Sequence, residues 1–136
     1  MREPARDKGR LRDILTAAGN VKEFTQGLSF DGFISNKLRY FAILKNVEIV
    51  GEAAYMLSKE FIAAHPDIPW KKMIRMRHVL VHGYSAVLPE ILWETAIHDL
   101  PSLYPIIEGI LESSETEIEN SESASSPEET PEQSRT

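Results

Sequence analysis

Apolar residues recur at helical spacing through most of the first 112 residues, and no segment shows the alternation typical of a β-strand. The first helical segment is expected to end near Gly27, and its apolar positions are Leu11, Ile14, Leu15, Ala18 and Val21. Ser, Asp and Gly at 29–32 indicate a short turn. A long helix is then predicted over 35–64, stopped by His65 and Pro66.

Gly51 lies inside this long predicted helix, where glycine costs about 1 kcal/mol relative to alanine. Two interpretations are equally favoured. The glycine, next to Ala53 and Ala54, marks the close approach of another helix, or it is simply tolerated.

Three more helices are predicted after a proline-bounded connector at 66–70. They cover 70–81, with Gly83 marking the end, then 90–98, opened by Pro89, and 102–112, opened by Pro101. The pattern therefore predicts an all-α fold, a bundle of four to five helices with short connections.

The C-terminal segment differs in composition from the rest of the chain. Residues 113–136 hold seven serines, seven glutamates and two prolines, with Ile118 almost the only sizeable apolar side chain. Such a segment buries too little surface to offset the entropy of ordering, so we expect a folded domain at 1–112 and a disordered Ser/Glu-rich tail at 113–136. An aid to solubility is favoured over competition with nucleic acid as its role.

The net charge of −6 comes from the same end of the chain. Residues 101–136 contain nine of the 21 acidic residues and one of the 15 basic ones, so 1–100 is slightly basic and compatible with a polyanionic partner. The absence of cysteine excludes disulfides, a thiol nucleophile and cysteine-ligated zinc. Neither a membrane span nor a signal peptide is expected, which favours a cytoplasmic protein.

Residues 70–84 carry the candidate chemistry. Four basic residues (Lys71, Lys72, Arg75 and Arg77) and two histidines (His78 and His82) interleave with apolar positions, so the helix has a buried flank and a basic flank. Helical spacing places Arg75, His78 and His82 on one face.

Arginine and histidine together suit cleavage of RNA without a metal. Arginine fits two phosphate oxygens, histidine moves a proton near neutral pH, and the 2′-hydroxyl of RNA supplies the nucleophile. From chemistry alone a merely solvated basic face is favoured. His78 and His82 as a zinc pair are weakly supported, and a serine triad is not excluded but lacks a GxSxG turn.

The motif Arg77-x4-His82-x-Tyr84 resembles the Rx4HxY signature of the HepT-like branch of the HEPN superfamily, the higher eukaryotes and prokaryotes nucleotide-binding domain. The likeness covers about residues 33–111 and includes further segments in the family's order. VEIVGEAA at 47–54 is similar to its IGEA helix, with LSKE following at 57–60. HPDIPW at 65–70 is similar to its connector, and ILWET at 91–95 with DLP at 99–101 to its closing segment.

The resemblance implies an antiparallel helical bundle that forms a homodimer with two Rx4H sites near the interface. It also implies a metal-independent ribonuclease without a cofactor, acting as the toxin of a type VII toxin–antitoxin pair. A small MNT-type nucleotidyltransferase would be the antitoxin. By the same resemblance Arg77 binds and stabilises the phosphate, His82 transfers the proton, and Tyr84 receives AMP. Lys71, Lys72 and Arg75 are candidates for RNA contacts.

His78 stands where the family usually has asparagine after the motif arginine, and it either assists His82 or marks altered chemistry. A second hypothesis is therefore kept. In it, the helical protein is a non-catalytic nucleotide- or RNA-binding partner, or substrate, of a minimal nucleotidyltransferase.

Overall fold

The computed structural model describes residues 4–125, and at Tyr84 and 115–125 it describes the backbone alone. Within this range the chain forms helices and no strand, in the order η1 (Pro4–Arg6), α1 (Asp7–Thr25), α2 (Phe30–Ser35), α3 (Lys37–Tyr55), α4 (Lys59–Ala64), α5 (Trp70–Gly83), η2 (Tyr84–Ala86), α6 (Pro89–Glu94), η3 (Thr95–Asp99) and α7 (Leu100–Ser125). The predicted all-α bundle is confirmed.

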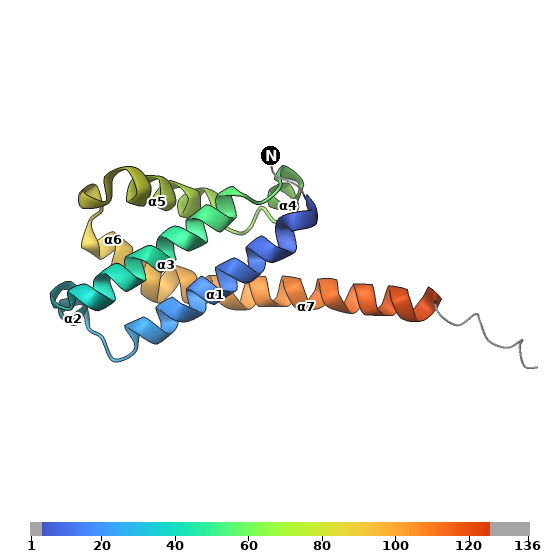
Figure 1. The fold of residues 1–136 in the computed structure, drawn as a ribbon, viewed down its shortest axis with the longest axis horizontal. Coiled ribbons are helices and arrows are strands. Elements are labelled where there is room, and N and C mark those ends of the chain that lie inside the picture. Colours follow the sequence, from blue (N-terminus) through green and yellow to red (C-terminus); the bar gives the residue numbers. More distant parts are fainter. Residues whose placement is uncertain (1–3, 126–136) are drawn as a thin grey trace, which may run out of the picture.

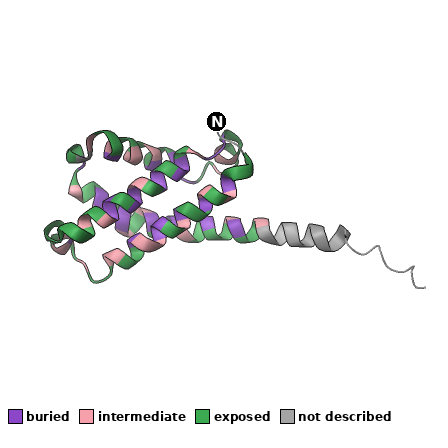
Figure 2. Ribbon diagram, viewed as in Figure 1, coloured by how far each residue is buried: buried purple, intermediate pink, exposed green. Residues whose placement is uncertain are grey.

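Helix α3 is the central element of the bundle. It lies antiparallel to α1 on one side and packs against α5 on the other, while α7 crosses beneath α1 (Figure 1). The buried residues face the space between these helices (Figure 2). The core includes Ile14 and Val21 of α1, Ile43 and Val50 of α3, and Ile107 of α7, each at most 1% exposed.

The helix predicted over 35–64 is not continuous, because the chain breaks at 56–58 between α3 and α4. Ser58 caps α4 by accepting a hydrogen bond from the Phe61 amide at 3.1 Å. The buried Asp7 carboxylate accepts bonds from the Ser58 amide at 2.9 Å and the Ser58 hydroxyl at 2.6 Å. These bonds satisfy the polar groups of the break and tie it to the start of α1.

The turn predicted at 29–32 is instead the start of a short helix, α2. Ser29 caps it by accepting a bond from the Gly32 amide at 3.0 Å. Phe33 in this helix is fully buried against Tyr40 and Trp93, with ring centroids 4.7 and 4.9 Å apart. Burial raises the pKa of the Tyr40 hydroxyl above its ordinary value.

The segments predicted as helices at 90–98 and 102–112 are helical, and Pro89 opens α6 as predicted. Their separation is wrong, because helical backbone continues from α6 to α7 through a π-turn, η3. The Leu100 amide donates to the Thr95 carbonyl there, so Pro101 lies in the first turn of α7 and starts no separate element.

No helix within the described range is long and apolar enough to cross a membrane.

Helix α7 also continues past the predicted end at 112 to Ser125, so backbone expected to be disordered is helical at 113–125. Extending an existing helix costs less than nucleating one, and glutamate has a good helix propensity. The rest of the predicted tail, 126–136, lies outside the described residues. The domain boundary at 112 stays a prediction.

Candidate functional site

Helix α5 carries the motif residues and is anchored at its first residue. The buried Trp70 donates from its indole Nε1 to the His65 carbonyl at 3.0 Å, and its amide donates to Ile68 at 2.8 Å. Met73 and Leu80 are buried farther along the helix. Because one face is buried, α5 presents a row of exposed side chains on its opposite face: Lys71, Arg75, His78 and His82.

The flank of α5 that bears Arg77 lies directly against α3 at Gly51. A Cβ added to Gly51 would contact the Cβ of Arg77 and would lie 2.6 Å from the Met73 carbonyl oxygen. No other residue type therefore fits this crossing without displacing α5. The close-approach interpretation of Gly51 is confirmed.

Two residues of α3 hold the Arg77 side chain beside this crossing. Its Nε donates to Glu52 Oε1 at 2.7 Å, and its guanidinium carbon lies 4.8 Å from the centroid of the Tyr55 ring. Arg77 is largely covered, with 21% of its side chain exposed, whereas Glu52 is 51% exposed. The Nε contact uses one of the five N–H donors of the guanidinium.

Glu52 and Tyr55 are not among the site residues predicted from the sequence. Two signals pointed to them. Gly51 marked the helix crossing, and Glu52 and Tyr55 follow it at the i, i+3 spacing of side chains that share a helix face.

His78 and His82 lie together on the exposed face of α5, as their spacing predicts. Their ring centroids are 4.7 Å apart and their planes are inclined by 53°. Among the described residues, no three His, Asp or Glu side chains are grouped so as to hold a metal ion.

Arg77 and His82 do not form a contact within one protomer. His82 is five positions after Arg77, which is a rotation of about 140° around the helix. Arg77 faces α3, while His82 faces solvent. Tyr84 opens η2 directly after α5, and its side chain is outside the described part of the structure.

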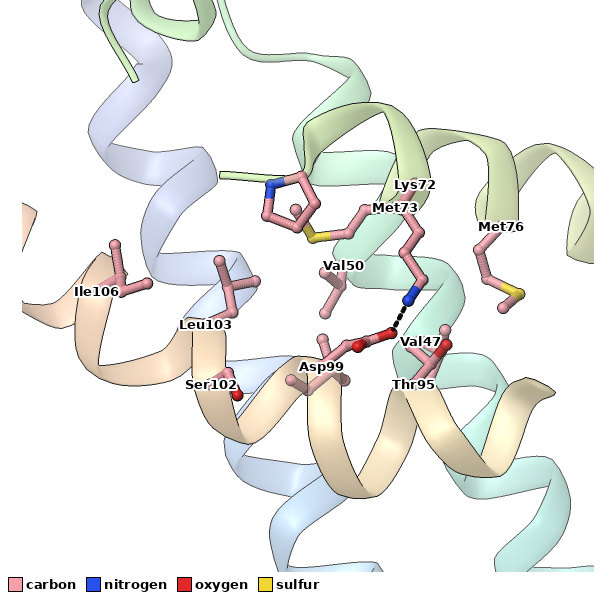
Figure 3. Close-up of a pocket in the computed structure, with 12 residues that line it drawn as sticks. Val47, Val50, Lys72, Met73, Met76, Thr95, Asp99, Ser102, Leu103 and Ile106 are labelled. Carbon is pink, nitrogen blue, oxygen red and sulfur yellow. Dashed lines mark ion pairs between the residues drawn. The ribbon is translucent and has the colours of Figure 1, made fainter. Parts of the chain in front are cut away.

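The candidate RNA-contacting residues differ in their surroundings. Lys71 and Arg75 are exposed, whereas Lys72 Nζ lies 2.7 Å from Asp99 Oδ2. This ion pair lies at a cavity of about 130 Å³ between α3, α5 and the η3–α7 segment (Figure 3). The cavity is otherwise mainly apolar, with Val50, Met73 and Leu103 among its lining residues. Asp99 therefore neutralises the charge of Lys72, whereas Lys71 and Arg75 are exposed to solvent.

Comparison with known proteins shows the family to which this helical bundle and its motif belong. The model of the family described as Ribonuclease HepT-like matches residues 14–110. The chain belongs to this family.

Two relatives illustrate the similarity. "Probable ribonuclease HepT" of Thermococcus cleftensis is 41% identical over 96 residues, which cover 71% of this chain and 87% of the relative. "Putative RNase MJ0127" of Methanocaldococcus jannaschii is 37% identical over 111 residues, which cover 82% and 92% of the two chains. No solved structure matches the chain.

Proposed function

We propose that the protein is a cytoplasmic, metal-independent endoribonuclease and the toxin of a type VII toxin–antitoxin pair. The observation that carries the proposal is the arrangement on α5, where an arginine is held against α3 and a pair of histidines lies on the exposed face, in a chain of the HepT-like ribonuclease family. The names of its relatives support RNA as the substrate.

In the proposed reaction, the 2′-oxygen of the RNA attacks the adjacent phosphorus and the bond to the 5′-oxygen breaks. The proton lost by the 2′-hydroxyl is balanced by the proton gained by the leaving 5′-oxygen. His82 mediates this proton transfer, with His78 as an auxiliary group, and Arg77 stabilises the charge that develops on the phosphate. The products are a 2′,3′-cyclic phosphate and a 5′-hydroxyl. DNA lacks the 2′-hydroxyl and is not a substrate.

The proposal is tested by incubating the purified protein with RNA in EDTA and analysing the ends of the fragments. Cleavage that persists and leaves 2′,3′-cyclic phosphate supports it. Dependence on a divalent metal would contradict the mechanism. If the protein cuts no RNA but is modified by a partner nucleotidyltransferase, the non-catalytic substrate hypothesis replaces it.

We also propose a homodimer, because the separation of Arg77 from His82 leaves each protomer with an incomplete site. Apolar side chains on α3 extend to the Arg77 region. Leu38 is 83% exposed, Phe41 50% and Tyr55 38%. Exposed apolar surface of this kind is typical of interfaces. A second copy covering this face brings two α5 helices toward one substrate phosphate.

Replacing Leu38 and Phe41 together with aspartate is expected to give a monomer with little ribonuclease activity, measured by light scattering and RNA cleavage. Leu88→Asp is the matched control, because Leu88 is 58% exposed and occupies the N-cap of α6, where aspartate is favourable. A wild-type protein that is monomeric at micromolar concentration and fully active would contradict the dimer.

Regulation is proposed to act through Tyr84. A partner MNT-type nucleotidyltransferase joins the tyrosine oxygen to the α-phosphate of ATP, and pyrophosphate leaves. The new phosphate lies on the segment that directly follows α5, where it pairs with cationic groups such as Arg77 and excludes the substrate.

Co-expression with a cognate MNT-type nucleotidyltransferase is expected to raise the intact mass by one AMP unit and to abolish RNA cleavage. Tyr84→Phe should keep its original mass. Suppressed toxicity without a mass change would rule out the modification, and a mass change that persists in Tyr84→Phe would place it on another residue.

A further inference from the structure

We infer that Glu52 is the positioning residue for Arg77, with the ring of Tyr55 fixing the plane of the guanidinium. The inference rests on the proposed ribonuclease function and adds a part of the site on α3 to the motif on α5. It follows from the 2.7 Å contact to Glu52, the 4.8 Å distance to the Tyr55 ring and the helix crossing at Gly51.

The position of the Glu52 contact on the guanidinium is informative. Glu52 engages Nε, the donor nearest the aliphatic part of the side chain, at a short distance typical of a charge-assisted hydrogen bond. A phosphate is bound by pairs of parallel N–H donors on the guanidinium edges. A carboxylate at Nε fixes the side chain and leaves the pair on the two terminal amino groups for a phosphate.

Tyr55 contributes orientation. Its ring lies one helical turn beyond Glu52 on α3, and the guanidinium is placed over it at cation–π distance. The carboxylate fixes one atom of the guanidinium and the ring fixes its plane. A flexible arginine thereby becomes a preorganised donor, which is the condition for stabilising a transition state.

Gly51 sets the distance over which these contacts form. Because α3 and α5 meet there without a side chain between them, the carboxylate of the next residue reaches Arg77 directly. Gly51, Glu52 and Tyr55 therefore act as one unit, which we call the arginine seat.

Glu52 also has an unfavourable effect on RNA binding, and this effect makes the inference testable. Its carboxylate is half exposed beside the proposed phosphate position, so its negative charge opposes RNA binding while its hydrogen bond orients Arg77. Glu52→Gln keeps an acceptor for Nε but removes the charge. Glu52→Ala removes both. The two variants are expected to change kcat and KM differently, which a purely structural role does not predict.

For cleavage of an RNA oligonucleotide, Glu52→Gln is expected to keep kcat within about threefold of wild type and to lower KM. Glu52→Ala is expected to lower kcat about 10–100-fold, the cost of a misplaced catalytic group. Tyr55→Leu keeps an apolar side chain without a ring, and it is expected to lower kcat by less than Glu52→Ala does. The control is Glu48→Ala, which removes a carboxylate of the same helix that is paired with the exposed Lys45 and should leave kcat unchanged.

A second measurement does not depend on activity. In a nuclear magnetic resonance spectrum the Nε–H of Arg77 is expected to be protected from exchange in wild type and in Glu52→Gln, and unprotected in Glu52→Ala. If the wild-type protein cuts no RNA, the proposed function fails, but this spectrum still tests whether the arginine seat holds the Arg77 side chain. An unprotected Arg77 Nε–H in wild type, or a wild-type kcat in Glu52→Ala, would overturn the inference. So would equal losses of kcat in Glu52→Ala and Glu52→Gln.

Discussion

Replacement of His82 by alanine is expected to lower the rate of RNA cleavage about 10²–10⁴-fold, the range for removing a positioned acid or base. Arg77→Ala is expected to lower it about 10²–10³-fold, because it removes the charge that stabilises the transition state. Neither change should unfold the protein. His82 is exposed, and the Glu52 carboxylate is 51% exposed, so removing Arg77 leaves no buried charge without a partner.

The measurement is the single-turnover rate in EDTA, with circular dichroism to confirm that each variant is folded. His98→Ala is the matched control. His98 is also an exposed histidine, but it lies on η3 and not on α5, and its Nδ1 is 2.7 Å from Glu94 Oε1. It should cut RNA at the wild-type rate. An unchanged rate in His82→Ala would rule out His82 as the proton-transfer residue.

Sequence periodicity was sufficient to predict the all-α fold and the extent of α5, but it placed several helix boundaries wrongly. The break between α3 and α4 depends on Asp7, which is 51 residues away from Ser58, so no local pattern contains it. Helix α2 has only six residues, too few for a periodic signal. The π-turn at η3 keeps the helical backbone continuous, where Pro101 in the sequence indicated the start of a separate helix.

The candidate site likewise has a part that the sequence predicts and a part that it does not. Arg77, His82 and Tyr84 were proposed from the spacing of one short motif. Glu52 and Tyr55 lie 25 and 22 residues before Arg77, and their role depends on the register in which α3 packs on α5. The sequence marked that register only through Gly51, and it left two interpretations equal. The close contact of α3 and α5 at Gly51 decides between them.

Gly51→Ala is expected to lower the free energy of unfolding by about 1–3 kcal/mol, the usual cost of overpacking. In an open helix the same change stabilises by up to about 1 kcal/mol. Here the added methyl would lie 2.6 Å from the Met73 carbonyl oxygen and against Arg77 Cβ, and neither can swing aside as the end of a flexible side chain could. The two helices must therefore separate.

Gly109→Ala is the control, because a Cβ at Gly109 in α7 has no neighbouring atom within 4 Å. Thermal unfolding should show a lower midpoint for Gly51→Ala and an unchanged or higher one for Gly109→Ala. Separation of the helices also moves Glu52 and Tyr55 away from Arg77, so Gly51→Ala should lose protection of the Arg77 Nε–H even at temperatures where it is fully folded. A stability equal to that of Gly109→Ala, with the Nε–H still protected, would show that the contact at Gly51 does not set the position of Arg77.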